Sequence, residues 1–364
     1  MSTYPEVQLD PAYQLALPSK PRPIVILGAG GIVRDAHLPA YQRAGYQVAV
    51  IADRQRERAQ ALADQYGIEV VCDSVAQAVA AAPADAVFDV ALMPEHFEQT
   101  LRALPDGAAV LLQKPLGHTL AAGQQLLQVC REKQLVAAVN TQLRFAPYVA
   151  VARELIASGA IGEIYDMEVY VEVNTPWAMF PAVLTLPRLE LNMHSVHYFD
   201  LVRSFFGDPD AVSATTVHHP AKDIANTRTT ALMRYRDRKL RVTVMTNHDH
   251  EFGPTYEQSF VKWEGTEGAI RLQLGLLLDY PQGREDKLEM VHLADSRGWV
   301  PVPFEGSWFP DAFMYSMGVL QRFVTGEIDT LPTAVADVIN TMAVVEAAYD
   351  DHEHGGTVPE YEVT

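Results

Sequence analysis

The sequence predicts an α/β domain with a doubly wound parallel sheet, followed by an α+β domain with a large, mostly antiparallel sheet. Up to about residue 145, continuous apolar runs alternate with amphipathic stretches, which is typical of parallel strands covered by helices on both faces. Beyond that point the predicted strands alternate apolar and polar residues, as in an antiparallel sheet with one covered face. The 364 residues suffice for two such cores.

In the first domain, residues 23–145, turn residues separate each predicted strand from the next predicted helix. We expect strands at 23–28, 46–53, 68–71, 86–92, 108–115 and 136–141. We expect helices at 31–45, 54–67, 74–82, 96–104 and 119–134. Residues 1–22 lack the basic start and apolar stretch of a secretory signal, and we expect them to form a surface arm.

The second domain, residues 146–364, begins with a predicted helix at 148–159. We expect strands at 164–173, 210–219, 229–236, 239–249, 256–265 and 268–274. We expect further helices at 189–207, 311–326 and 333–351. The exposed face of such a sheet suits self-association, so we expect a homodimer or homotetramer.

Composition and charge exclude several classes of protein. The formal net charge is −18, whereas nucleic acids and anionic membranes are bound by basic faces. No apolar run reaches the roughly 18 residues of a membrane span. Two cysteines, Cys72 and Cys130, are too few for a disulfide framework. We therefore expect a cytoplasmic protein that binds neither nucleic acid nor membrane.

A glycine-rich turn links the first strand to the first helix. Gly28, Gly30 and Gly31 have the strand–turn–helix context of a dinucleotide-binding fingerprint, in which a pyrophosphate sits at the helix N-terminus. Ile32 and Val33 continue the turn, and Val33 replaces the usual third Gly or Ala. The turn alone is a weak signal, because it is also compatible with an ordinary tight turn.

Asp53 strengthens this interpretation. It ends the second strand, where a carboxylate about 20 residues after the turn meets the ribose hydroxyls; it is also placed to cap the next helix. A carboxylate there favours NAD, although the adjacent Arg54 would suit NADP. The sequence therefore predicts an NAD cofactor, with NADP as the alternative.

Three further segments carry recognisable motifs: LLQKPLG at 111–117, the run at 140–165, and HSVHYFDLVRSFFGDP at 194–209. In this order they resemble the glucose–fructose oxidoreductase and inositol dehydrogenase (Gfo/Idh/MocA) family. The first resembles the family's Glu-Lys-Pro signature, with Gln113 in place of Glu. The resemblance covers nearly the whole chain after residue 22. It implies a Rossmann domain, hydride transfer and a sugar or polyol as substrate.

The resemblance also implies roles for two residues. Lys114 matches the signature lysine, which lies between nicotinamide and substrate; desolvation at a strand end can lower its pKa into a useful range. His197 matches the catalytic histidine, whose unperturbed pKa suits a base for the hydroxyl proton. From the residues alone, Lys114 would be a surface lysine and His197 a histidine of the core.

The region before His197 departs from the family pattern. The family commonly has Asp four residues earlier, where this chain has Met193. On a helix, Glu190, His194 and His197 would share one face. Either histidine is then a candidate base while the other positions the substrate, and Glu190 would orient either histidine or bind the substrate. These residues, with His248 or His250, would also suit a divalent metal. We expect instead a polar wall around a sugar, with no metal.

Further candidates follow strands of the first domain. Asn140 and Arg144 come after its last strand, at the edge where ligands bind in such sheets, and Arg144 would either bind substrate or bridge the domains. Pro94 and His96 follow the strand at 86–92 and are candidate nicotinamide contacts.

We expect an enzyme that oxidises a secondary alcohol of a sugar, sugar derivative or polyol, or reduces the ketone, with His197 or His194 moving the proton. The alternatives are a closed-cycle enzyme with a tightly held cofactor and a redox sensor without turnover.

Overall fold

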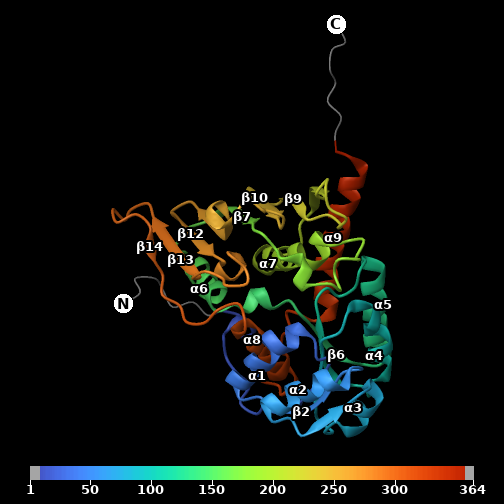
Figure 1. The fold of residues 1–364 in the computed structure, drawn as a ribbon. Helices are drawn as coiled ribbons and strands as arrows, with labels where there is room; N and C mark the ends of the chain where they lie inside the picture. Colours follow the sequence, from blue (N-terminus) through green and yellow to red (C-terminus); the bar gives the residue numbers. More distant parts are fainter. Residues whose placement is uncertain (1–8, 357–364) are drawn as a thin grey trace. The chain divides into compact units, whose positions relative to one another are not determined.

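The computed structural model describes residues 9–356, which fall into two compact units (Figure 1). Unit 1 is Met1–Ala160 with Pro303–Met342, and unit 2 is Ile161–Val302 with Ala343–Thr364, each within the described range. Each unit is built on its own sheet. The units therefore match the two predicted fold classes.

Unit 1 contains a six-stranded parallel sheet with the order β3-β2-β1-β4-β5-β6. This is the doubly wound order, which brings β1 and β4 together at the point where ligands bind in such folds. Its strands are β1 (Ile24–Leu27), β2 (Val48–Ala52), β3 (Val70–Cys72), β4 (Val87–Val90), β5 (Ala109–Gln113) and β6 (Val136–Asn140). The predicted parallel sheet is confirmed.

The helices of unit 1 follow the strands as the alternation predicts. They are α1 (Leu38–Ala44), α2 (Arg56–Tyr66), α3 (Val75–Ala81), α4 (Phe97–Ala103), α5 (Leu120–Glu132), α6 (Pro147–Ala157) and α8 (Asp311–Val324). The first predicted helix differs, because residues Val33–His37 before α1 form a π-helical turn, η2. A π turn holds one extra residue, which the apolar spacing of the sequence does not reveal.

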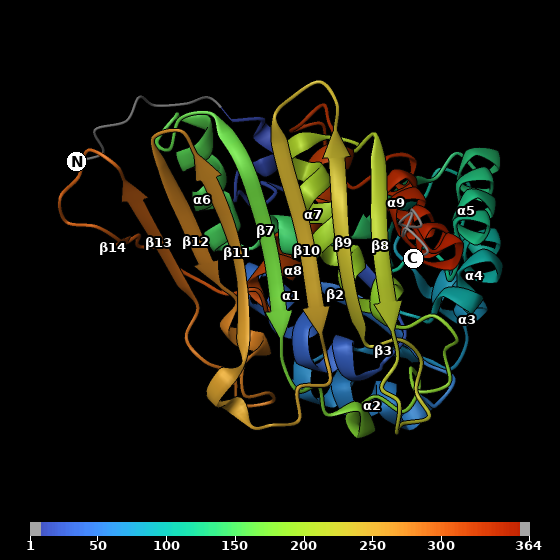
Figure 2. The same ribbon diagram turned by 90° about the horizontal axis from the view of Figure 1, so that it is seen from above.

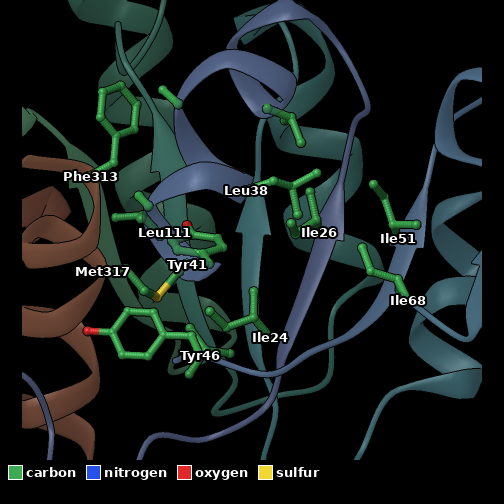
Figure 3. Close-up of a cluster of buried hydrophobic side chains, with 14 of the residues drawn as sticks. Ile24, Ile26, Leu38, Tyr41, Tyr46, Ile51, Ile68, Leu111, Phe313 and Met317 are labelled. Carbon is green, nitrogen blue, oxygen red and sulfur yellow. The ribbon is translucent and has the colours of Figure 1, made fainter. Parts of the chain in front are cut away.

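Helix α8 belongs to unit 1 although it lies some 170 residues after β6 in the sequence. Phe313 and Met317 of α8 pack with Ile24, Tyr41 and Leu111 in one buried cluster (Figure 3). The helix contacts β5, β6 and α1. The division of the chain therefore differs from the expected one at residue 145, since residues 146–160 and 303–342 fold with the first sheet.

Unit 2 contains an eight-stranded sheet with the order β14-β13-β12-β11-β7-β10-β9-β8 (Figure 2). Only β7 and β10 pair in parallel; the other described pairs are antiparallel. The strands are β7 (Ile164–Glu172), β8 (Ala211–Val217), β9 (Arg228–Tyr235), β10 (Leu240–Asn247), β11 (Gln258–Gly265), β12 (Gly268–Gln273), β13 (Lys287–His292) and β14 (Val300–Pro301). The last two were not predicted.

Helix α7 (Val196–Phe206) lies against β10 of this sheet. The π-helical turn η6 (Leu191–Ser195) precedes α7, so the predicted helix at 189–207 is interrupted by a second π turn. Helix α9 (Val335–His354) begins in unit 1 and ends in unit 2.

The described part of the predicted arm packs on unit 1. Ala12 is fully buried, and Arg322 of α8 donates hydrogen bonds to the carbonyl oxygens of Pro11 and Gln14. Residues 1–8 of the arm lie outside the described residues. Within residues 9–356, no helix has the length and apolar character that a bilayer crossing requires.

Candidate active site

The glycine turn after β1 has the shape that a dinucleotide needs. Gly28 has a φ of 113°, and a Cβ there would collide with the carbonyl oxygen of Ala91, so only glycine fits. A Cβ on Gly30 would meet nothing within 4 Å, which leaves space for a pyrophosphate to approach the backbone. The side chain of Val33 is fully buried in the core. Val33 therefore anchors the turn by packing, and any cofactor contact is left to its backbone.

Asp53 holds the glycine turn against the end of β2. Its carboxylate accepts a hydrogen bond from the backbone N–H of Ala29 at 2.8 Å and another from Gln55 at 2.8 Å. Each carboxylate oxygen can accept a further bond, so these contacts are compatible with the predicted ribose contact. The guanidinium of Arg54 lies 3.5 Å from Nε2 of His96. Arg54 and His96 are thus neighbours beside the turn, and the buried Pro94 starts the 3₁₀ turn Pro94–His96 that carries His96.

Gln113 sits in a buried hydrogen-bond network at the end of β5. Its amide nitrogen lies 3.0 Å from Nε2 of His37, and its amide oxygen accepts the backbone N–H of Lys114 at 2.8 Å. Nδ1 of His37 lies 2.6 Å from the carboxylate of Asp89, which also accepts from Tyr41 at 2.7 Å. The pattern is complete when His37 carries its proton on Nδ1. We name Gln113, His37, Asp89 and Tyr41 the β5 network.

The sequence interpretation missed most of the β5 network, because His37, Tyr41 and Asp89 lie far from Gln113 in the chain. His37 sits in the π turn η2, and its side chain is fully buried. The only sequence signal was Gln113 itself, where the related signature has Glu. An amide there serves two neighbours at once, as donor to His37 and acceptor from Lys114.

Lys114 follows β5 directly and is partly exposed. Burial lowers the pKa of its ammonium to about 8, because a charged group loses hydration inside the protein. A lysine with such a pKa exchanges protons near neutral pH. Its position at the C-terminal edge of the parallel sheet is the one at which ligands bind in this fold.

Asn140 and Arg144 differ in what their side chains contact. Asn140 ends β6 with 1% exposure, and within residues 9–356 neither polar atom of its amide has a hydrogen-bond partner. Buried amides usually have partners, so this amide is poised for a ligand. The guanidinium of Arg144 donates to the Tyr13 hydroxyl at 3.2 Å and to the Pro332 carbonyl at 2.8 Å, and lies 3.7 Å from Asp337. These contacts favour a structural role for Arg144.

In unit 2, the π turn η6 changes the expected spacing of the polar residues. The backbone N–H of Val196 reaches back five residues to the carbonyl of Leu191, whereas an α-helix reaches back four. The hydroxyl of Ser195 donates to Glu190 at 2.8 Å across the same turn. The expected α-helical face of Glu190, His194 and His197 is therefore not formed as predicted.

The structure instead brings Glu190 and His194 together with His248. Ligand atoms of these three residues lie within 4.8 Å of one another, and we name them the polar cluster. The rings of His194 and His248 stack with centroids 4.0 Å apart. The indole of Trp177 packs against both rings, at 5.5 Å and 6.2 Å.

Two other histidines lie outside the polar cluster. His197 is 7% exposed in the first turn of α7. His250, the other histidine that the sequence offered as a metal ligand beside His248, has its Nδ1 3.4 Å from Glu172. Strand β10 ends at Asn247, so the alternation of a strand does not extend to these residues.

Burial controls the charge of the polar cluster. It raises the pKa of the Glu190 carboxyl, and hydrogen bonds to the carboxylate, that of Thr229 first, oppose the shift. Burial lowers the pKa of His248 to about 4. Both shifts favour the neutral form, because the protein interior hydrates charges poorly. Burial therefore disfavours the charged forms of Glu190 and His248.

Two family models match the chain. Residues 22–141 match the Gfo/Idh/MocA model described as an oxidoreductase family with an NAD-binding Rossmann fold. Residues 149–271 match the C-terminal domain model of the same family.

Curated relatives and solved structures are also similar to this chain. D-apiose dehydrogenase of Paraburkholderia graminis is 24% identical over 92% of this chain and 88% of its own. D-glucoside 3-dehydrogenase of Escherichia coli is 31% identical over 41% of this chain and 43% of its own. An oxidoreductase from Agrobacterium radiobacter, in complex with NAD+, L-tartaric acid and magnesium, has a TM-score of 0.76 at 21% identity and covers 93% of this chain and 98% of its own. Levoglucosan dehydrogenase in complex with NADH and levoglucosan has a TM-score of 0.75 at 18% identity, with 92% and 98% covered.

Proposed function

Because this chain belongs to the Gfo/Idh/MocA family of oxidoreductases, we propose that it oxidises a secondary alcohol of a sugar, sugar derivative or polyol with NAD, or reduces the corresponding ketone. It is an oxidoreductase with an NAD(P)-binding Rossmann domain. The relatives named above act on apiose, glucosides and levoglucosan by their names, which supports a substrate of this class.

The observation that carries the proposal is the position and acidity of Lys114. It follows β5, two strands from the glycine turn of β1, at the same edge of the sheet. Its pKa of about 8 keeps a large protonated fraction at neutral pH. An ammonium at that place stabilises the negative charge that develops on the alcohol oxygen.

The residues of the site divide the remaining tasks. When bound, the nicotinamide accepts the hydride from the alcohol carbon. The buried amide of Asn140 is a donor and acceptor for hydroxyl groups of the substrate. We assign the removal of the hydroxyl proton to His197 or His194, since imidazole is a base near neutral pH. Glu190 then contacts further hydroxyl groups of the substrate.

NAD is the proposed cofactor, on the evidence of Asp53. Its carboxylate stands beside the glycine turn, where it would repel the 2′-phosphate of NADP. The neighbouring Arg54 would attract that phosphate, so the preference for NAD rests on the balance of these two side chains.

The test is a panel of sugars, sugar acids and polyols, with the absorbance of reduced nicotinamide as readout. NAD+ and NADP+ are supplied separately to the wild type, to Lys114→Ala, and to Lys20→Ala, which removes an exposed lysine. We expect turnover with NAD+ in the wild type and in Lys20→Ala, and a loss of at least about 100-fold in Lys114→Ala. Equal turnover in all three proteins would contradict the role of Lys114.

A further inference from the structure

The polar cluster of unit 2 gathers ligand atoms around one point. Glu190 precedes the π turn η6, His194 lies within it, and His248 follows β10. A carboxylate oxygen and one ring nitrogen from each histidine lie within 4.8 Å of one another. Glu190 is fully buried and His248 is 1% exposed, so these two side chains are shielded from bulk water, whereas His194 is half-buried.

His248 is oriented as a ligand. Its Nδ1 lies 3.0 Å from the hydroxyl oxygen of Thr175. Its Nε2 lies 3.9 Å from Oε1 of Glu190, too far for a hydrogen bond, and has no partner among the described residues. An imidazole that donates Nδ1–H to an oxygen presents the lone pair of Nε2, which is how most metal-bound histidines are held.

We propose that Glu190, His194 and His248 bind one divalent transition-metal ion such as Zn²⁺. Sites that bind zinc or non-haem iron often use two imidazoles and one carboxylate as ligands. Such sites leave some coordination positions of the ion open for other ligands. Mg²⁺ and Ca²⁺ prefer sets made of oxygens alone. Ligand atoms at 2.0–2.2 Å from one ion are roughly 3–3.5 Å apart, so the three side chains must close by about one ångström.

The ligand types predict how binding depends on pH. A metal ion binds the deprotonated carboxylate and the neutral imidazole, so it competes with protons for all three side chains. We expect the affinity to rise with pH. The open positions of the ion suit water or adjacent hydroxyl groups.

The ion site shares Glu190 and His194 with the proposed substrate site, so the two proposals are separated by a residue outside the cluster. Lys114 and the glycine turn belong to unit 1, whereas the three ligands belong to unit 2. Lys114→Ala is therefore expected to bind the ion as the wild type does. Ion binding is measured without substrate or cofactor, so its outcome and that of the turnover assay are distinguishable.

The experiment titrates the full chain, freed of metal by a chelator, with Co²⁺ and with Zn²⁺. Visible absorption reports Co²⁺ coordination, and calorimetry in two buffers reports Zn²⁺ affinity and proton release. The proteins are the wild type, His248→Gln, Glu190→Gln and the control His218→Gln, which changes an exposed histidine. We expect one ion per chain in the wild type and the control, and at least about tenfold weaker binding in the other two.

Two results would overturn the metal site: a wild type that binds neither ion, or equal affinities in the wild type and His248→Gln. Glu190→Gln keeps the side-chain volume and the acceptor for Ser195, so it provides a second test if His248→Gln does not fold. Thermal unfolding of each variant shows whether it is folded. A wild type without ion binding would identify the cluster as a hydrogen-bonding wall alone.

Discussion

Lys114 and Gln113 are adjacent in the sequence and serve different tasks. Gln113 points into the β5 network, where it bonds His37 and the backbone of Lys114. Lys114 follows at the sheet edge with a lowered pKa. The glutamine in place of the family's glutamate thus fixes the strand end without placing a second carboxylate, besides that of Asp89, against His37. The chemistry is left to Lys114.

The pKa of Lys114 predicts an alkaline limit to activity. The proposed role needs the ammonium form, which is present below a pKa of about 8 and is lost above it. We expect kcat/KM of the wild type to fall as pH rises through about 8. In Lys114→Arg the guanidinium stays protonated, so the residual activity should show no such fall up to about pH 10. An unchanged pH profile in Lys114→Arg would contradict the assignment.

Gln113→Leu tests the β5 network through stability. The change removes the hydrogen-bond partner of Nε2 of His37 and that of the N–H of Lys114, and an unsatisfied buried group costs about 1–3 kcal/mol. We expect the free energy of unfolding, measured with urea, to fall by at least about 2 kcal/mol. The control Gln60→Leu removes an exposed bond to Asp64 and should change it by less than about 0.5 kcal/mol. Similar losses in both variants would refute a special role for Gln113.

At the scale of elements, apolar periodicity predicted most strands and helices in order. It did not reveal η2 and η6, because one extra residue in a turn leaves the composition unchanged. It also missed β13 and β14, which are short strands at one edge of the eight-stranded sheet. Apolar periodicity could not predict the polar cluster, for two reasons. His194 is positioned by the π turn, and His248 comes from a loop that only the fold brings near.

The π turn η6 changes which residue we expect one turn before His197. The N–H of Val196 reaches back five residues to Leu191; the same reach from His197 would place Asn192 there, whereas an α-helix would place Met193. We expect Asn192→Asp to stabilise the protonated imidazole of His197, and so to shift the acidic limb of kcat/KM to higher pH by about one unit. Met193→Asp should not shift it. The reverse pattern would show that the helix is α-helical at this point in solution.

At the scale of the whole molecule, each compact unit joins segments that are distant in the sequence. In unit 1, residues 303–342 pack in the core of the first sheet. Family models and motifs, in contrast, describe consecutive stretches of the sequence. The sequence could predict α8 from its own pattern. It could not assign α8 to unit 1, because the amphipathic pattern of a helix does not say which sheet it covers.

Phe313→Ala tests whether α8 packs in the core of unit 1. Phe313 is 1% exposed in the cluster that contains Ile24 and Leu111, and truncating a buried phenylalanine costs about 3–5 kcal/mol. We expect that loss in urea unfolding, together with weaker NAD binding. Phe252→Ala, at an 83% exposed side chain, should change stability by less than about 0.5 kcal/mol. A small effect of Phe313→Ala would mean that α8 is not part of this core.

The most direct measurement of the central claim follows the transferred hydrogen. A sugar or polyol that the panel identifies is supplied with deuterium on its alcohol carbon, and the nicotinamide is analysed by mass spectrometry, both free and released from the denatured protein. We predict deuterium in the reduced nicotinamide, with much slower labelling in Lys114→Ala. Oxidised substrate without deuterium in either nicotinamide fraction would contradict hydride transfer to this cofactor.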